Sequence, residues 1–200
     1  MSTYYILACR GGPSTLYFRL ETELTNGECW VMGRAFAPEE DDSDFHPPEG
    51  VIELTSKIDS KAPERIYPEL TWNPVPLMSR RLVAALQSAG VDNLQTFETR
   101  VVNPQGAPPL PEDYYLAVNI LGLVAAADMR RSKTSSATAK EAASVDFHAL
   151  SVDPSKAGGH GIFRLAENVS AVLVHERVRQ HVERAGIDTL TWQKPETWAG

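Results

Sequence analysis

Two short segments of the chain follow the same pattern, Ala-Gly-[Val/Ile]-Asp-x-Leu, at positions 89–94 and 185–190. Each follows a stretch whose apolar residues recur at helical spacing. Glycine readily adopts the left-handed conformation with which many helices end, and the β-branched residue after it can pack back on the helix. The pattern therefore predicts two related helix–Gly–strand units, 77–102 and 173–198, with Leu94–Val102 as the strand of the first.

The two predicted helices have matching apolar faces. Ser79 is a suitable N-cap for the first helix, in which Leu82 and Leu86 lie on one face, and Val178 and Val182 take similar places in the second. Convergence on a common order of helix, glycine and strand would explain the likeness. An internal duplication explains the shared pattern and the preserved apolar spacing better.

The N-terminal part has the character of a β-sheet. Four short runs are rich in aromatic or β-branched residues: Tyr4–Cys9, Thr15–Leu20, Glu28–Phe36 and Val51–Ser56. Asn26-Gly27 is a favoured hairpin turn between two of them. We therefore expect an α+β fold with a β-rich N-terminal subdomain, 1–72, and an α+β C-terminal subdomain, 73–200, that holds the two duplicated units.

The region between the two units contains an apolar segment followed by a polar one. The residues Pro111 to Leu121 predict a buried strand, in which Asn119 is a polar group among apolar neighbours. Because an unsatisfied amide in a core costs about 1 to 3 kcal/mol, Asn119 should be hydrogen-bonded to the backbone of a neighbouring segment. The stretch 130–145, rich in Ser, Thr, Ala and Lys, predicts a weakly ordered surface excursion.

Residues 37–48 predict a loop. Its three prolines oppose regular pairing, and its five acidic residues repel one another. One interpretation is a solvated connection without a role. The other is an acidic finger that engages a basic partner, with these residues as candidate contacts and Phe45 as an apolar anchor: Glu39, Glu40, Asp41, Asp42, Asp44 and Phe45.

The charge and cysteine content indicate the kind of partner. A formal charge of −7 disfavours direct binding to nucleic acid or anionic lipid and favours a basic protein partner. With only Cys9 and Cys29, a disulfide framework is not expected. The longest apolar stretch, Leu116–Ala127, is too short to span a bilayer, and no signal peptide is recognisable. We expect a cytoplasmic protein without a membrane segment.

The sequence carries no motif for catalysis, a metal or a cofactor. His175-Glu176 resembles the start of a zinc-protease motif, but His181 lies six residues on instead of four. Neither cysteine has a neighbouring histidine to activate it, and no phosphate-binding loop occurs. The chain is therefore predicted not to be an enzyme. An enzyme with scattered site residues, such as His148, Asp153 and His160, remains an alternative.

Several segments in order resemble one family. They are Leu77-Met78-Ser79, Gly90-Val91, Tyr114 to Ile120, Ala127-Asp128, Gly161 to Leu165 and Ala185 to Ile187 before Trp192. From Leu70 to Trp192 the chain resembles immunity protein family 11 of bacterial polymorphic toxin systems. The resemblance implies a non-catalytic protein, often in a type VI secretion setting, that binds a cognate toxin and protects its producer.

The expected location and the charge of the chain indicate which class of toxin it would bind. A cytoplasmic immunity protein would meet toxins that act in the cytoplasm, and enzymes that act on nucleic acids carry basic grooves that an acidic inhibitor can occupy. We expect a tight one-to-one complex that occludes the active site of a nuclease. An adaptor or chaperone that escorts a secreted effector, leaving its activity intact, is the alternative.

Overall fold

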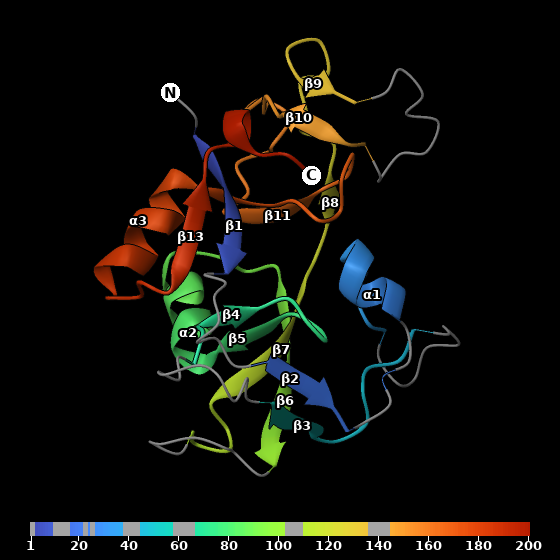
Figure 1. Ribbon diagram of the computed structural model, residues 1–200, viewed down its shortest axis with the longest axis vertical. Coiled ribbons are helices and arrows are strands. Elements are labelled where there is room, and N and C mark those ends of the chain that lie inside the picture. Colours follow the sequence, from blue (N-terminus) through green and yellow to red (C-terminus); the bar gives the residue numbers. More distant parts are fainter. Residues whose placement is uncertain are drawn as a thin grey trace.

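The computed structural model describes residues 3–9, 17–21, 24, 27–37, 45–57, 67–102, 110–135 and 145–200. These residues form two larger sheets, a two-stranded hairpin and three short α-helices (Figure 1). Helices α2 (Arg80–Ser88) and α3 (Glu176–Arg184) lie on one side, where they contact each other. Helix α1 (Gly27–Met32) stands on the opposite side. The predicted α+β, β-rich fold class is confirmed.

The larger sheet has six strands. Their spatial order is β2 (Tyr17–Leu20), β3 (Ile52–Lys57), β6 (Leu94–Val102), β7 (Tyr115–Ile120), β5 (Leu77–Ser79) and β4 (Leu70–Thr71). Strands β3 and β6 are parallel, and every other pair is antiparallel. All six residues of β7 are buried, the polar Asn119 among them, as is typical of a strand in the interior of a sheet.

The second sheet has five strands. Their spatial order is β13 (Leu190–Gln193), β1 (Tyr4–Cys9), β12 (Val172–His175), β11 (Ile162–Leu165) and β8 (Leu123–Val124). Strands β9 (Lys133–Thr134) and β10 (Phe147–Ala149) form the separate hairpin, and a 3-10 turn, η1 (Pro195–Thr197), precedes the C-terminus. Strand pairing in both sheets crosses residue 72, and the division into subdomains 1–72 and 73–200 stays a prediction.

Both predicted helix–Gly–strand units exist, and their ends are built alike. Ser79 caps α2 with its hydroxyl, which accepts from the Leu82 amide, and His175 caps α3 with Nδ1, which accepts from the Arg177 amide. Each helix ends at a glycine with positive φ, 85° at Gly90 and 73° at Gly186. The repeated sequence pattern at residues 89–94 and 185–190 therefore correctly predicts where each of the two helices ends.

The two units also share a topology. Strands β5 and β6, which flank α2, both pair antiparallel with β7, which lies between them. Strands β12 and β13, which flank α3, both pair antiparallel with β1 in the same way. This is a likeness of arrangement, and descent of both units from one duplicated segment stays a prediction.

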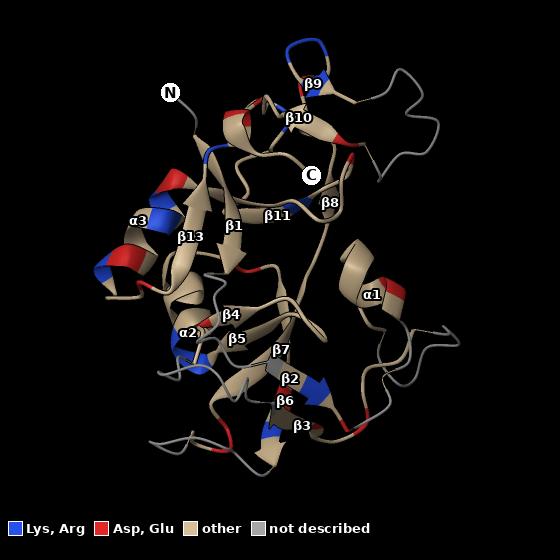
Figure 2. Ribbon diagram, in the orientation of Figure 1, with Lys and Arg blue, Asp and Glu red and all other residues tan. Residues whose placement is uncertain are grey.

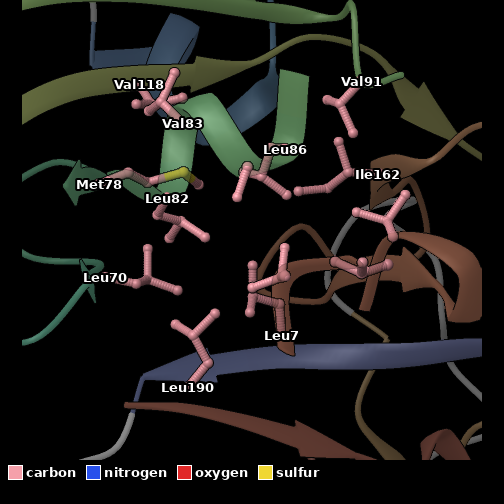
Figure 3. Packing of buried hydrophobic residues seen from close by; sticks show 14 of the residues in the cluster. Leu7, Leu70, Met78, Leu82, Val83, Leu86, Val91, Val118, Ile162 and Leu190 are labelled. Atoms are coloured by element: carbon pink, nitrogen blue, oxygen red, sulfur yellow. The ribbon is translucent and has the colours of Figure 1, made fainter. Parts of the chain in front are cut away.

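The main core lies between the two helix-bearing units (Figure 3). Figure 3 shows Leu82 and Leu86 of α2 facing Leu7 of β1 and Ile162 of β11 across this core. A second cluster lies under the β9–β10 hairpin, around Phe147 and Phe163. A third packs α1 against the larger sheet and includes Trp30. Burying a side chain of this size stabilises the fold by about 1.5 to 3 kcal/mol.

One predicted strand is wrong. The run Glu28–Phe36 forms helix α1 and a following extended segment, and Gly27, expected in a hairpin turn, begins the helix. Cys29 and Trp30 of the helix and Gly33 directly after it are buried, a spacing that places residues on one face of a helix but on both faces of a strand. The aromatic and β-branched composition that suggested a strand was overridden by this packing.

Two other predictions concern the middle of the chain. Asn119 is fully buried, and its Nδ2 donates to the Arg34 carbonyl at 2.6 Å, which confirms the predicted bond to a neighbouring backbone. Within the stretch 130–145, residues 136–144 lie outside the described part of the chain. The rest includes β9, which pairs with β10.

Candidate functional site

The acidic residues proposed as toxin contacts, Glu39, Glu40, Asp41, Asp42 and Asp44, lie outside the residues that the structure describes. Their neighbour Phe45 is described. It is partly buried against the third core cluster, and the Arg34 guanidinium lies over its ring, 5.3 Å from the centroid. The role of this loop as a toxin contact stays a prediction.

Helix α1 precedes that loop and is fixed to the larger sheet by its C-terminal end. Gly33 has φ of 61°, and a Cβ there would lie 2.5 Å from the Ile120 carbonyl oxygen. The Gly33 carbonyl accepts from the Gly122 amide at 2.9 Å. The side chain of Gln95 holds both backbone groups of Phe36, at 2.9 and 3.2 Å. Only glycine fits this close approach, so α1 has a defined place.

A cavity of about 340 Å³ lies beside α1, between this helix, the segment 72–76 and the turn after β11. It is walled mainly by apolar side chains, including Trp30, Trp72 and Pro74. Val31 and Ser170 also line it and are solvent-exposed, so they lie at its opening. We call it the Arg164 cavity, because Arg164 is the one charged residue among the described residues that line it.

Arg164 is a buried cation, with only 5% of its surface exposed. One terminal nitrogen donates to the Trp30 carbonyl at 3.0 Å and the other to the Val169 carbonyl at 2.9 Å. The Nε–H has no acceptor, and no carboxylate pairs with the guanidinium, within the described part of the chain. Burial accordingly lowers the pKa of Arg164 to about 10.

Trp30, like Arg164, has a buried hydrogen-bond donor without an acceptor in the described part of the chain, its indole Nε1–H. The ring itself is fixed by edge contacts to Phe36 and Phe97, at centroid distances of 5.0 and 5.3 Å. Two residues that line one cavity thus each carry a buried hydrogen-bond donor without a partner. Such an arrangement suits a group that accepts hydrogen bonds, above all an anion.

The sequence reading missed this site. In the sequence, Arg164 stands out only as part of the segment Gly161 to Leu165, which carries part of the family resemblance. A single arginine inside the otherwise apolar strand Ile162–Leu165 is the signal that could have found it, because arginine is rarely fully buried unless it is paired. The cavity itself joins three segments far apart in sequence, which spacing alone cannot reveal.

A second charged feature lies on α3, on the opposite side of the molecule (Figure 2). Arg179 pairs with Glu176 and Glu183 at 2.9 Å each and lies over the Tyr5 ring. The bond from Arg179 lowers the pKa of Glu176 to about 2. These charged side chains are paired with one another on a partly exposed helix face, whereas α1 carries Glu28 as its single charged residue. We therefore regard the α3 face as structural.

The described residues do not bring His148, Asp153 and His160 together by any contact between them. His148 contacts Ser135, Asp153 accepts from Ser155, and the His160 ring lies beside Phe163. No group of three or more His, Cys, Asp or Glu side chains in the described ranges could hold a metal ion. The scattered-site alternative of His148, Asp153 and His160 thus gains no geometric support from these ranges.

Comparison with known proteins gives the chain its family. Among the described residues, no helix is both long and apolar enough to cross a membrane. No curated protein matches the chain. The model of the immunity protein family Imm11 matches residues 17–197, which confirms the resemblance read from the sequence. The chain therefore belongs to the Imm11 family of immunity proteins.

Proposed function

We propose that this immunity protein neutralises a nuclease toxin in the cytoplasm by covering its active site in a one-to-one complex. The observation that carries the proposal is the family match over residues 17–197, which makes a toxin the expected partner. Type VI secretion is the delivery route that we propose for that toxin. No cofactor is required, because inhibition by occlusion depends on contact alone.

The charge of the chain supports a nuclease as the target. A nuclease must bind a polyanion, so its active site lies in a positively charged groove. A chain of formal charge −7 is attracted to such a groove over a distance of about one Debye length, which raises the association rate. The acidic residues 39–44 are the densest negative charge in the sequence and are proposed to meet the basic rim.

Co-expression tests the proposal. The C-terminal domain encoded by the adjacent large toxin gene is induced with and without this chain, and growth, nucleic-acid integrity and co-purification are followed. The proposal predicts degraded nucleic acid without the chain, and growth with a stable one-to-one complex when it is present. Binding that leaves toxicity intact would instead support the adaptor alternative. A toxin that leaves nucleic acid whole would contradict the nuclease assignment.

The acidic loop is tested separately by charge removal. The variant carries E39Q, E40Q, D41N, D42N and D44N. Its association rate with the toxin should fall by about tenfold or more at low salt, and the difference should shrink as salt rises. Five exposed acids elsewhere provide a control with the same change of charge: D92N, E112Q, D146N, D188N and E196Q. An equal loss in both variants would mean that only net charge matters.

A further inference from the structure

We propose that the Arg164 cavity receives an acidic side chain of the toxin, together with an apolar residue beside it. This inference rests on the proposed function, because it names the chemistry of the toxin segment that the immunity protein binds. It goes beyond the acidic loop, since it assigns a second contact of opposite charge at a built cavity.

The cavity has the size and walls of a receptor for one or two side chains. Its volume of about 340 Å³ lies at the lower end of the range for ligand sites. Trp30 and Trp72 provide aromatic walls, and Val31 remains 51% exposed at the opening. Aromatic residues set in a pocket, such as the buried Trp30 and the partly buried Trp72, are common at the centre of a protein interface.

Two residues that line the cavity carry buried donors that no described atom accepts from, and this favours an anionic acceptor as the occupant. A guanidinium has five N–H groups, and Arg164 donates from two of its nitrogens to backbone carbonyls, while its Nε–H has no acceptor and no carboxylate balances its charge within the described residues. Trp30 adds a further buried donor without an acceptor. A carboxylate can accept two parallel bonds from a guanidinium, and this pairing gains strength where water is excluded.

The chemistry favours a protein carboxylate over a phosphate. Phosphate sites usually combine several cations or a row of backbone amides, whereas this cavity has one cation and apolar walls. A chain of formal charge −7 also repels nucleic acid at long range. An acidic residue beside an apolar one matches both the charge and the walls. Nuclease toxins can supply such residues, since carboxylates are common ligands for catalytic Mg²⁺.

Arg164 also has a structural contact that any test must separate from ligand binding. Its bond to the Trp30 carbonyl occupies one of the last carbonyls of α1, a place where cations commonly stabilise a helix end. Replacing Arg164 would therefore alter α1 as well as the cavity. Ser170 avoids this problem, because it lines the same cavity, is exposed and has no side-chain hydrogen bond to α1.

The first arm uses small probes and the four tryptophans of the full chain. Phenylacetate and its neutral match phenylacetamide are titrated while the indole N–H resonances are followed by NMR. Phenylacetate should shift Trp30 and Trp72 with millimolar affinity, as its size allows, and phenylacetamide should bind at least about tenfold more weakly. Trp192 and Trp198, which do not line the cavity, are internal controls. Inorganic phosphate should bind more weakly than phenylacetate.

The second arm uses the toxin domain. Ser170→Glu supplies a competing carboxylate at the opening, and Ser170→Gln is its uncharged match. Ser170→Glu should weaken both phenylacetate and toxin binding by about tenfold, and Ser170→Gln by less than about twofold. If wild type does not bind the toxin, the proposed function fails. If wild type and Ser170→Glu bind it equally, only the cavity assignment fails.

Three further outcomes would overturn the cavity assignment. Equal binding of phenylacetate and phenylacetamide would show an apolar pocket without anion preference. Tighter binding of phosphate than of phenylacetate would point to a nucleotide or nucleic acid as the occupant. Phenylacetate binding that appears only after E39Q, E40Q, D41N, D42N and D44N would show that the chain's own loop competes for Arg164.

Discussion

The two sides of the molecule differ in whether a buried charged side chain has a partner of opposite charge. On the α2–α3 side, the buried carboxylate of Glu69 accepts from the Ser79 hydroxyl and lies 3.6 Å from the Arg81 guanidinium. On the α1 side, the buried guanidinium of Arg164 meets only backbone carbonyls in the described residues. A charge whose partner is built into the fold stabilises it, whereas a charge without one costs stability and is kept where a partner can supply the counter-charge.

The α2–α3 side is also joined internally. Arg81 donates to the Ala185 carbonyl at the end of α3 at 2.6 Å, and Ser88 contacts His181 at 2.9 Å. The α1 side is instead placed by a close backbone approach at Gly33 and by the amide side chains of Gln95 and Asn119. We therefore propose that the α2–α3 side mainly stabilises the fold and that the α1 side binds the toxin.

The largest expected effect on unfolding free energy is at Gly33, which follows α1 and holds it against the larger sheet. Gly33→Ala combines a positive φ with a Cβ 2.5 Å from the Ile120 oxygen, so we expect a loss of about 3 kcal/mol in unfolding free energy. Gly90→Ala is the control, because it has the same sign of φ but nothing within 4 Å of its Cβ. Urea unfolding measures both. Equal losses would mean that close approach does not fix α1.

The next effect is at Glu69, on the stable side. Glu69→Leu leaves the Ser79 hydroxyl without its acceptor and removes the partner of Arg81, so unfolding free energy should fall by about 2 kcal/mol. Toxin affinity should stay within about twofold of wild type, because Glu69 does not line the Arg164 cavity. A large drop in affinity with unchanged stability would reverse the comparison.

A smaller and pH-dependent effect is expected at His175, the N-cap of α3. Burial and the nearby Arg177 charge lower the pKa of His175 from its ordinary 6.5, and its Nδ1 must be unprotonated to accept from the Arg177 amide. The folded pKa lies below the unfolded one, so this stabilisation is complete above about pH 6.5 and is lost as pH falls through the folded value.

His175→Ala should cost about 1 kcal/mol at pH 7.5 and less at low pH. His175→Asn keeps an N-cap that does not titrate in this range, so the difference between wild type and His175→Asn should change with pH below 6.5. Urea midpoints at several pH values give this difference. A difference that is constant with pH would show that His175 does not cap through Nδ1.

The smallest effect on stability is expected at Arg164. Arg164→Met relieves the cost of a desolvated charge but also removes two bonds to carbonyls, one of them at the end of α1; because these effects oppose each other, unfolding free energy should change by less than about 1 kcal/mol. Toxin affinity should nevertheless fall at least tenfold. A stability loss above about 3 kcal/mol would mark Arg164 as structural.

The parts of the fold that sequence could predict are those that depend on near neighbours. Ser79, Gly90 and the apolar spacing of α2 act within one or two helical turns, and the structure has them as predicted. The bond of Asn119 was predicted from the general rule that buried amides are hydrogen-bonded; its Nδ2 follows the rule, whereas its Oδ1 has no partner among the described atoms. The sequence could not name its partner, Arg34, because that contact joins segments 85 residues apart.

The wrong strand prediction and the missed cavity both involve contacts between segments that are far apart in the sequence. Residues 27–32 have a composition typical of strands, but packing of Cys29 and Trp30 on the larger sheet makes them a helix. The candidate site was sought where charge is dense in sequence, at residues 39–44. The cavity is assembled from α1, the segment 72–76 and β11, so its chemistry depends on tertiary contacts that no local pattern contains.

Hydrogen exchange of the chain, free and in complex with the toxin domain, tests most directly which side binds. The account predicts that the toxin slows exchange in segments 27–37, 72–76 and 164–170, and leaves α3, residues 176–184, unchanged. Slowed exchange in α3, with the three cavity segments unchanged, would contradict the assignment of binding to the α1 side.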